Sequence, residues 1–285
     1  MRAMIVAASL ALLMGFIPLN AWSQEDAPRM LLLTKSSGWE HDSIKEKDGK
    51  MGHVQSVVQK LADENGAELT STKDASIINE EDLADFDLVV FYTSGDLTKK
   101  ATDGQPAMGK DGLDALLCWI KDGGAFMGYH AASDTFGHHT GDPDLPYIKM
   151  IGAEFEIHDD QFVGTLRVVD PDHPAIGGLS DGFSIRDEWY RFKNISKDEI
   201  HVLALLDPGD EREIQEGYNI PNYPVIWCRE YGEGRVFFNA MGHREDVWDN
   251  EDFQAAFVNA AEWALGESAA QAKPNYNEVV PSEDE

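Results

Sequence analysis

Between residues 30 and 266 the chain alternates short apolar runs with longer segments in which apolar residues recur every three or four positions. A short apolar run predicts a buried strand, and the longer spacing predicts a helix with one buried face. The predicted strands are 30–34, 67–71, 88–92, 125–129, 162–169, 202–206, 223–230 and 235–240. The predicted helices are 54–65, a short helix after Asn79, 110–121 and one from Asn250 to Gly266. This alternation predicts an α/β fold with helices on both faces of a sheet.

The two ends of the chain lack this alternation. Residues 1–23 have a basic start, a short apolar stretch and small residues before Ser23, which is typical of a cleaved signal peptide. The apolar stretch is shorter than the roughly 18 residues of a membrane-spanning helix. We therefore expect no transmembrane anchor and a periplasmic or secreted protein cleaved near Ser23. The rest divides into a linker (24–28), one domain (29–266) and a disordered tail (267–285).

The acidic composition excludes two classes of partner. The 285 residues include 52 Asp and Glu against 23 Lys and Arg, a formal net charge of −29. Phosphate backbones and anionic membranes attract basic segments, so we expect neither as a partner. The 42% hydrophobic content indicates a folded core. Cys118 and Cys228 both lie in apolar runs, which favours two buried free thiols and leaves a single disulfide as the alternative.

Three histidines follow predicted strands, at the positions where open α/β sheets bind their ligands. His41 lies in the loop after strand 30–34, His130 directly follows strand 125–129, and His243 comes shortly after strand 235–240. We expect all three on one rim of the sheet. Because imidazole transfers protons near neutral pH or binds a transition metal, the group predicts a functional site rather than three separate loop residues.

His130 stands at the centre of the segment Gly128-Tyr129-His130-Ala131-Ala132, at a predicted strand-to-helix junction. Small residues around a polar one resemble the nucleophile elbow of hydrolases, in which the central residue is Ser or Cys. Histidine at this position argues against an acyl-enzyme mechanism. Ser133 is predicted to start the following helix rather than to act as a nucleophile.

Six motifs stand in order along the chain: GWEHDSI (38–44), GGAFMGYHAASDTF (123–136), IGAEFEIHDD (151–160), DHPAIGGL (172–179), DEWYRF (187–192) and YGEGRVFFNAMGH (231–243). Together they resemble the ThuA-like, or trehalose-utilisation, family, over residues 29–266. The resemblance implies a flavodoxin-like fold similar to class I glutamine amidotransferases, a three-layer sandwich with a mostly parallel sheet. It also implies a role in carbohydrate metabolism, beside oxidoreductases that make 3-keto sugars.

The resemblance also implies which residues form the site. The family pattern matches at His41, His130, Asp134, His158, Glu188, Tyr190 and His243. Glu40 occupies a position that is often basic in relatives, which implies a more acidic pocket rim. His130 replaces the cysteine nucleophile of true glutamine amidotransferases, which argues against ammonia transfer from glutamine.

These residues lead to a functional hypothesis. We assign catalytic roles to His130, His41, His243, Glu188 and Asp134, and substrate-binding roles to Trp39, Asp96, Tyr190 and His158. A divalent metal such as zinc would be held by His41, His130, Glu188 and His243. The predicted protein is an enzyme, a hydrolase, lyase or isomerase, that acts on a small neutral carbohydrate or keto-sugar. The alternative is a non-catalytic carbohydrate-binding protein of the envelope, which holds a sugar without forming a product.

Overall fold

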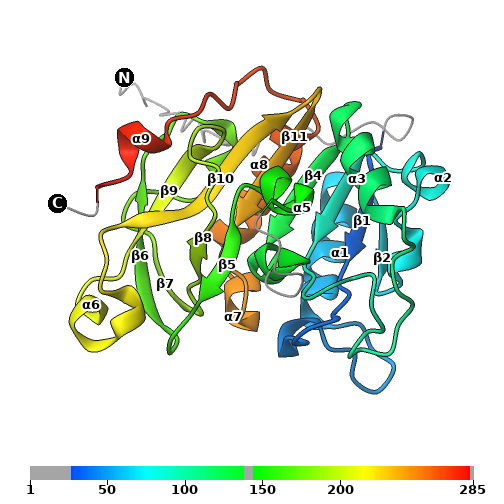
Figure 1. Ribbon diagram of the computed structural model, residues 1–285, viewed down its shortest axis with the longest axis horizontal. Coiled ribbons are helices and arrows are strands. Elements are labelled where there is room, and N and C mark those ends of the chain that lie inside the picture. The colour runs from blue at the N-terminus through cyan, green and yellow to red at the C-terminus, as the bar shows by residue number, and fades with distance from the viewer. Residues whose placement is uncertain (1–26, 138–143, 283–285) are drawn as a thin grey trace, which may run out of the picture.

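A nine-stranded sheet forms the centre of the computed structural model, which describes residues 27–137 and 144–282 (Figure 1). The strands lie in the order β2-β1-β3-β4-β11-β10-β9-β6-β7. Their bounds are β1 Arg29–Leu33, β2 Glu68–Thr72, β3 Leu88–Phe91, β4 Ala125–Tyr129, β6 Phe162–Val168, β7 Ser184–Asp187, β9 His201–Asp207, β10 Tyr223–Tyr231 and β11 Gly234–Asn239. Strands β2, β1, β3, β4 and β11 pair in parallel, and the pairings from β11 to β7 are antiparallel. The predicted α/β fold is confirmed.

Helices cover both faces of this sheet and make the molecule three layers deep (Figure 1). One face carries α1 (His53–Asn65), α7 (Glu245–Trp248) and α8 (Glu251–Ala264), and the other carries α2 (Glu80–Leu83), α3 (Gly112–Lys121) and α5 (Pro146–Ile151). α8 begins where the Asn250 side chain accepts a hydrogen bond from Phe253 N at 3.0 Å. Its apolar stripe, which includes Phe253 and Phe257, packs against β4 and β11.

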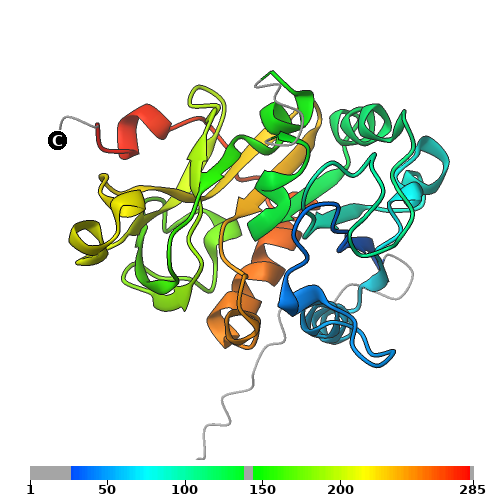
Figure 2. The ribbon, with the colours of Figure 1, turned by 60° about the horizontal axis from the view of Figure 1, so that its bottom comes forward.

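The parallel strands bring their carboxyl ends to one edge of the sheet. β1 and β3 are continuous apolar runs because they are buried on both faces, as parallel strands between helices are. Figure 2 turns this edge forward, and the chain around the start of α1 lies beside α7, which follows β11. The segments that follow β1, β3, β4 and β11 therefore meet at this edge.

The antiparallel half contains elements that the apolar pattern did not predict. β7 is a polar edge strand, and β5 (Glu154–Ile157) and β8 (Arg191–Lys193) form a separate two-stranded sheet. α6 (Glu211–Ile214) buries none of its residues. Short elements with few buried positions carry no apolar run, so the sequence pattern does not mark them.

The C-terminal segment differs from the predicted disordered tail. It runs past the start of β9 and includes α9 (Tyr276–Val279). The Asn275 side chain accepts a hydrogen bond from Val202 N at 2.6 Å and donates one to Val202 O at 3.0 Å. His201 Nδ1 lies 2.6 Å from Lys273 O. β6 pairs only with the later part of β9, and the C-terminal segment supplies hydrogen-bond partners for the backbone at its start. The periodicity of apolar residues does not reveal such a long-range contact.

Both cysteines are free thiols. Cys228 lies in β10 and is fully buried, and burial raises the pKa of its thiol well above the usual value. A buried neutral thiol of this kind is a packing residue. The prediction of a buried Cys118 is wrong, because α3 turns Leu116, Leu117 and Ile120 inwards and leaves Cys118 exposed.

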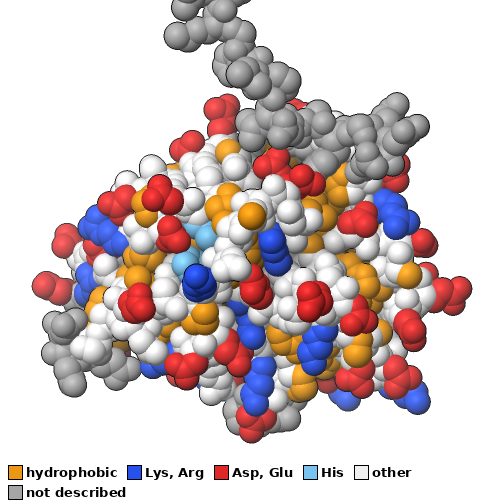
Figure 3. Space-filling model, turned by 90° about the horizontal axis from the view of Figure 1, so that it is seen from above, with side chains coloured by type: hydrophobic (Ala, Val, Ile, Leu, Met, Phe, Trp, Pro, Cys, Tyr) orange, Lys and Arg blue, Asp and Glu red, His pale blue; other side chains and the backbone are white. Residues whose placement is uncertain are grey.

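The surface formed by the described residues is acidic. On the face seen in Figure 3, Asp and Glu side chains lie all round, with Lys and Arg among them, in line with the net charge of −29. Among the helices that the structure describes, none has both the length and the apolar character needed to cross a bilayer. The predicted signal peptide (1–23) and residues 24–26 of the predicted linker lie outside the described residues.

Candidate metal centre

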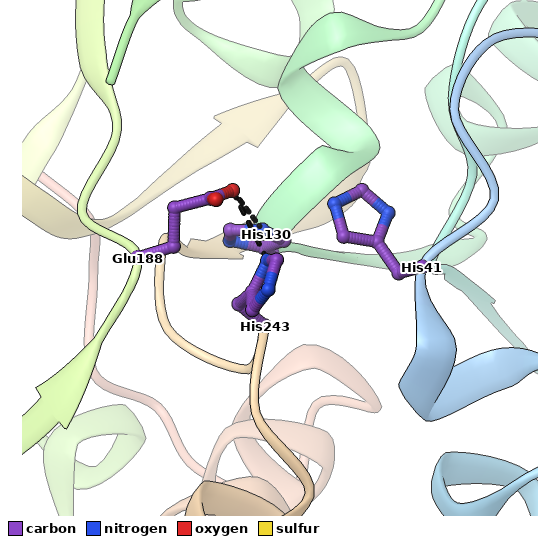
Figure 4. A group of neighbouring side chains, drawn as sticks. All are labelled: His41, His130, Glu188 and His243. Carbon is purple, nitrogen blue, oxygen red and sulfur yellow. Dashed lines mark ion pairs between the residues drawn. The ribbon is translucent and has the colours of Figure 1, made fainter. Parts of the chain in front are cut away.

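Four side chains from separate segments meet at the carboxyl edge of the parallel strands (Figure 4). His41 precedes the 3-10 turn Asp42–Ile44, His130 directly follows β4, and His243 lies between β11 and α7. Glu188 directly follows β7. One ligand atom of each residue lies within 4.8 Å of those of the other three, and all but His243 are buried. We term this group the His3Glu cluster.

The three imidazole rings of the His3Glu cluster lie nearly perpendicular to one another. Their centroids are 4.9 Å apart for His41 and His130, 5.1 Å for His41 and His243, and 5.3 Å for His130 and His243, with interplanar angles of 82°, 86° and 78°. His130 Nε2 and His243 Nδ1 are buried and have no hydrogen-bond partner among the described residues. Such atoms are costly to bury, so the arrangement favours a ligand that takes nitrogen lone pairs.

His130 has a backbone and a tautomer that both fit a metal ligand. Its φ is +46°, in the left-handed region that residues with a side chain rarely adopt. Its Nδ1 lies 2.9 Å from the carbonyl oxygen of Ala240, which can only accept a hydrogen bond. In the neutral imidazole Nδ1 therefore carries the proton, and Nε2 keeps its lone pair. Metal-binding histidines are typically oriented by this kind of hydrogen bond from the second nitrogen.

Glu188 supplies the carboxylate of the cluster. Its Oε2 lies 3.0 Å from His243 Nδ1 and 3.5 Å from His130 Nε2. The shorter distance joins an ion pair when His243 is protonated, although the His243 atom is not aligned for a hydrogen bond. Burial opposes the ionisation of Glu188, but His130 and His243 outweigh it and lower the pKa of the carboxyl group. Glu188 is therefore ionised at neutral pH.

The histidines of the cluster differ in their protonation. Burial, together with the nearby His130 and His243, lowers the pKa of His41 well below its ordinary value, so His41 is neutral at pH 7. Burial also disfavours a charged His243, but Glu188 outweighs it and raises the pKa of His243. A metal that binds here would therefore displace a proton from His243 in part of the molecules.

Three further predicted site residues lie beside the cluster. The Tyr190 ring is 4.1 Å from the His130 ring, and its hydroxyl is 3.4 Å from His41 Nε2. His158 stacks on Tyr190 and places its Nδ1 3.5 Å from Glu188 Oε1. Asp134 is half-buried at the end of the 3-10 turn that His130 begins. Burial, then Glu188, and more weakly Asp134, raise the pKa of the Tyr190 hydroxyl well above its usual value.

The structure does not bring Trp39 and Asp96 into the cluster. The Trp39 side chain is 72% exposed, and its ring lies 5.9 Å from the Lys45 ammonium group. Asp96 Oδ1 accepts hydrogen bonds from the backbone N and the hydroxyl of Thr98, which closes a local turn. Their substrate-binding roles stay predictions.

Two residues of the site were missed by the sequence analysis. Asp187 is fully buried and accepts a hydrogen bond from Gly242 N at 2.6 Å. The Tyr92 hydroxyl donates to Gly242 O at 3.0 Å, and its ring lies 5.6 Å from the His41 ring. Their only sequence signals are that Asp187 adjoins Glu188 and that Tyr92 ends a predicted strand. Neither signal separates them from ordinary structural residues.

Two surface hollows are lined by residues of the site, and one of them includes a member of the cluster. One, of about 450 Å³, is lined by His158, Asp159, Asp160 and Gln215. The other, of about 530 Å³, is lined by His243 together with Asp42, Ser43, Lys47, Gln161, Arg244, Glu245, Asp246 and Asp249. A solute can therefore approach the cluster beside His243, while the other hollow borders His158, a neighbour of Glu188.

Solved structures share this fold. A ThuA-like protein from Bacteroides uniformis matches with a TM-score of 0.66 and 20% identity, over 90% of this chain and 98% of that one. A ThuA-like protein from Parabacteroides merdae matches with a TM-score of 0.65 and 16% identity, over 91% and 99%. At these identities the similarity shows the fold alone. A search of curated proteins finds no match.

The comparisons correct the prediction of a periplasmic or secreted protein. Two further similar structures, from Salmonella typhimurium, are described as cytoplasmic proteins. They match with TM-scores of 0.53 and 0.56 at 13% identity, over 83% of this chain and 98% and 99% of theirs. The prediction rested on an apolar stretch within residues 1–23, which lie outside the described residues. Export is therefore not part of the function proposed below.

A family comparison identifies the sequence relatives of this chain. The model of the ThuA family, described as trehalose utilisation, matches residues 29–264. This range contains all six motifs and most of the chain. It also spans every strand of the central sheet and all four members of the His3Glu cluster. The chain therefore belongs to the ThuA family of trehalose utilisation, as its motifs predicted.

Proposed function

We propose that this protein is a metal-dependent enzyme of carbohydrate metabolism that acts on a small neutral sugar or keto-sugar as a hydrolase, lyase or isomerase. The observation that carries the proposal is the His3Glu cluster, whose four ligand atoms lie within 4.8 Å of one another. Two of its nitrogens are buried without hydrogen-bond partners among the described residues. Simple sugar binding does not require three imidazoles at one point.

The donor set fits a divalent metal such as zinc. Zinc in catalytic sites is bound by imidazole nitrogens and carboxylate oxygens, the donors that His41, His130, His243 and Glu188 provide. A metal bound there would polarise a carbonyl oxygen or lower the pKa of a water molecule. The hydrogen bond from His130 Nδ1 to Ala240 O supports this role, because it leaves Nε2 as the donor atom.

Residues beside the cluster supply the remaining chemistry. Tyr190 keeps its proton because burial raises the pKa of its hydroxyl, so it can donate a hydrogen bond to a hydroxyl or carbonyl oxygen of the substrate. His158 is partly exposed beside Glu188, a position suited to exchanging protons with solvent. Asp134 remains a candidate for acid-base chemistry, and no step is assigned to it.

The charges around the site favour a neutral substrate. The hollow beside His243 is lined by Asp42, Glu245, Asp246 and Asp249 but by only two cationic side chains, Lys47 and Arg244. Arg244 pairs with Asp246 at 2.8 Å, which leaves the lining acidic. These side chains would repel phosphorylated or carboxylated sugars from the mouth of the hollow. The family description, trehalose utilisation, supports a sugar as the substrate.

The proposal is tested by metal analysis and product analysis on the same preparation. Protein purified without a histidine tag should contain about one equivalent of a divalent metal. It should convert a sugar from a panel of disaccharides and 3-keto-glycosides, and His130→Ala should abolish both metal and turnover. His53→Ala, which changes a histidine outside the cluster that pairs with Asp249, should abolish neither. Saturable sugar binding without a product would favour the non-catalytic alternative. Absence of metal together with unchanged turnover in His130→Ala would refute the proposal.

A further inference from the structure

The backbone of Gly242 lies between two members of the His3Glu cluster. His243 directly follows Gly242 in the chain. Glu188 directly follows Asp187, whose side chain binds the N–H group of Gly242. Gly242 has a φ of +119°, a conformation that residues with a side chain rarely adopt. A Cβ atom here would lie 3.0 Å from Trp248 Nε1, so glycine also provides room for the Trp248 side chain. The backbone of this segment is therefore fixed where it leaves β11.

Asp187 binds the backbone N–H group of Gly242. Its Oδ2 accepts a hydrogen bond from Gly242 N at 2.6 Å, and its Oδ1 accepts one from Glu188 N at 2.9 Å. The side chain is completely buried. A carboxylate that binds two backbone N–H groups in the interior makes strong, directional hydrogen bonds. One side chain thus joins the backbone next to His243 to the backbone of Glu188.

Tyr92 and Trp248 bind the carbonyl oxygen of Gly242. The Tyr92 hydroxyl donates to Gly242 O at 3.0 Å, and Trp248 Nε1 donates to it at 2.8 Å. Both backbone polar groups of Gly242 are therefore bound, by side chains from β7, from the residue after β3 and from α7. No side chain of this group is a member of the His3Glu cluster.

We propose that Asp187, with Tyr92, clamps the backbone of Gly242 and so sets the separation between Glu188 and His243 on which metal binding depends. The inference rests on the proposed metal centre and assigns Asp187 as a positioning residue. β7 lies at the edge of the sheet, four strands beyond β11 in the sheet order. The hydrogen bond from Gly242 to Asp187 directly links the segments after these two strands. Glu188 Oε2 and His243 Nδ1 are then held 3.0 Å apart, ready to share a metal.

The test compares Asp187→Asn with a matched variant, Asp103→Asn. Gly242 N and Glu188 N bind different oxygens of Asp187, and Asn replaces one of these oxygens by an NH2 donor, so in the same orientation it keeps only one of the two hydrogen bonds. Asp103 also accepts two backbone hydrogen bonds, from Ser36 N at 2.8 Å and from Gln105 N at 2.9 Å, and its buried side chain lies 3.8 Å from Lys35 Nζ. Each full-length protein is freed of metal and titrated with cobalt(II), and affinity and the visible absorption of the bound ion are recorded.

We expect Asp187→Asn to weaken cobalt binding roughly 10- to 100-fold, as changes behind metal ligands do, and to shift the visible bands. Asp103→Asn should bind as the wild type does, although it also loses a buried carboxylate. Equal affinity and equal spectra for wild type and Asp187→Asn would overturn the inference and leave the metal centre standing. Equal weakening in both variants would also overturn it, since the effect would then be general destabilisation.

A wild type that binds no cobalt would overturn the metal centre itself, and the inference with it. If Asp187→Asn does not fold, Tyr92→Phe tests the other side of the clamp. This variant removes one hydroxyl oxygen and leaves the Trp248 hydrogen bond to Gly242 O in place. We expect roughly fivefold weaker cobalt binding, the equivalent of one hydrogen bond. Unchanged affinity in Tyr92→Phe would refute the clamp.

Discussion

Replacing Glu188 by Gln is the most direct test of the His3Glu cluster. The substitution keeps the size of the side chain but removes its charge, and the new amide group donates hydrogen bonds where a metal needs a donor of electrons. Glu188 Oε2 lies 3.0 Å from His243 Nδ1 and 3.5 Å from His130 Nε2, and Glu188 is the single carboxylate among the four members of the cluster. We expect zinc to stabilise the wild type strongly and Glu188→Gln hardly at all.

The size of this effect follows from linkage. A ligand that binds only the folded state at 100 times its Kd stabilises it by about 2.7 kcal/mol. In a domain of this size about 1 kcal/mol shifts the melting temperature by roughly 2–4 °C, so zinc should raise Tm by roughly 5–11 °C. Loss of a ligand should weaken binding at least as much as loss of its supporting groups, about 100-fold. At the same zinc concentration the variant then gains only about 0.4 kcal/mol, a shift of roughly 1–2 °C.

The assay is thermal unfolding with and without zinc, with the metal-free protein as the baseline for each variant. Glu154→Gln is the matched control, because Glu154 is another buried glutamate, bound by Asn194 Nδ2 at 2.6 Å and lying 3.5 Å from Lys193 Nζ. We expect this control to lower the baseline Tm and to keep the full zinc shift. A wild-type zinc shift in Glu188→Gln would refute the proposed ligand set.

Two further predictions concern stability away from the cluster. Burial, and secondarily His201, lowers the pKa of His173 from its ordinary value of about 6.5 to about 4 in the folded protein. The contribution of neutral His173 to stability is therefore complete above pH 6.5 and is lost as the pH falls towards 4. His173→Asn should therefore flatten the pH dependence of the urea midpoint between pH 6.5 and 4, and an unchanged slope would contradict this. Asn275→Ala removes both hydrogen bonds to Val202 and should lower the free energy of unfolding by about 1–3 kcal/mol. Asn277→Ala, which loses one exposed hydrogen bond, should change it by less than about 0.5 kcal/mol, and equal effects would refute a specific role for Asn275.

The three histidines of the cluster could be anticipated from local patterns. Apolar runs mark β1, β4 and β11, and the residues after parallel strands share one edge of the sheet. His130 directly follows such a strand, so its position at this edge can be predicted from the strand alone. Tyr190, by contrast, reached the list of site residues only through the family motif, because an aromatic residue beside a carboxylate is equally typical of a surface turn.

Glu188 shows where local patterns stop being sufficient. It follows β7, a polar edge strand without an apolar run, so neither the strand nor its end could be found from periodicity. Its approach to His243 depends on how a nine-stranded sheet curves and on one hydrogen bond between Asp187 and Gly242, which are 55 residues apart. The role of Trp39 was predicted from the family resemblance; its side chain is exposed, and the role stays a prediction.

The positions of the four ligands have a consequence for how the cluster responds to metal. They span residues 41 to 243 and come from segments after β1, β4, β7 and β11, so both the parallel and the antiparallel half of the sheet must be in place before they meet. An unfolded chain cannot present this set of donors, and metal binding then adds directly to the free energy of folding. Zinc should therefore shift the unfolding of the whole domain as one transition. If the parallel and antiparallel halves unfolded separately in the presence of zinc, the metal-bound cluster would not depend on both halves of the sheet.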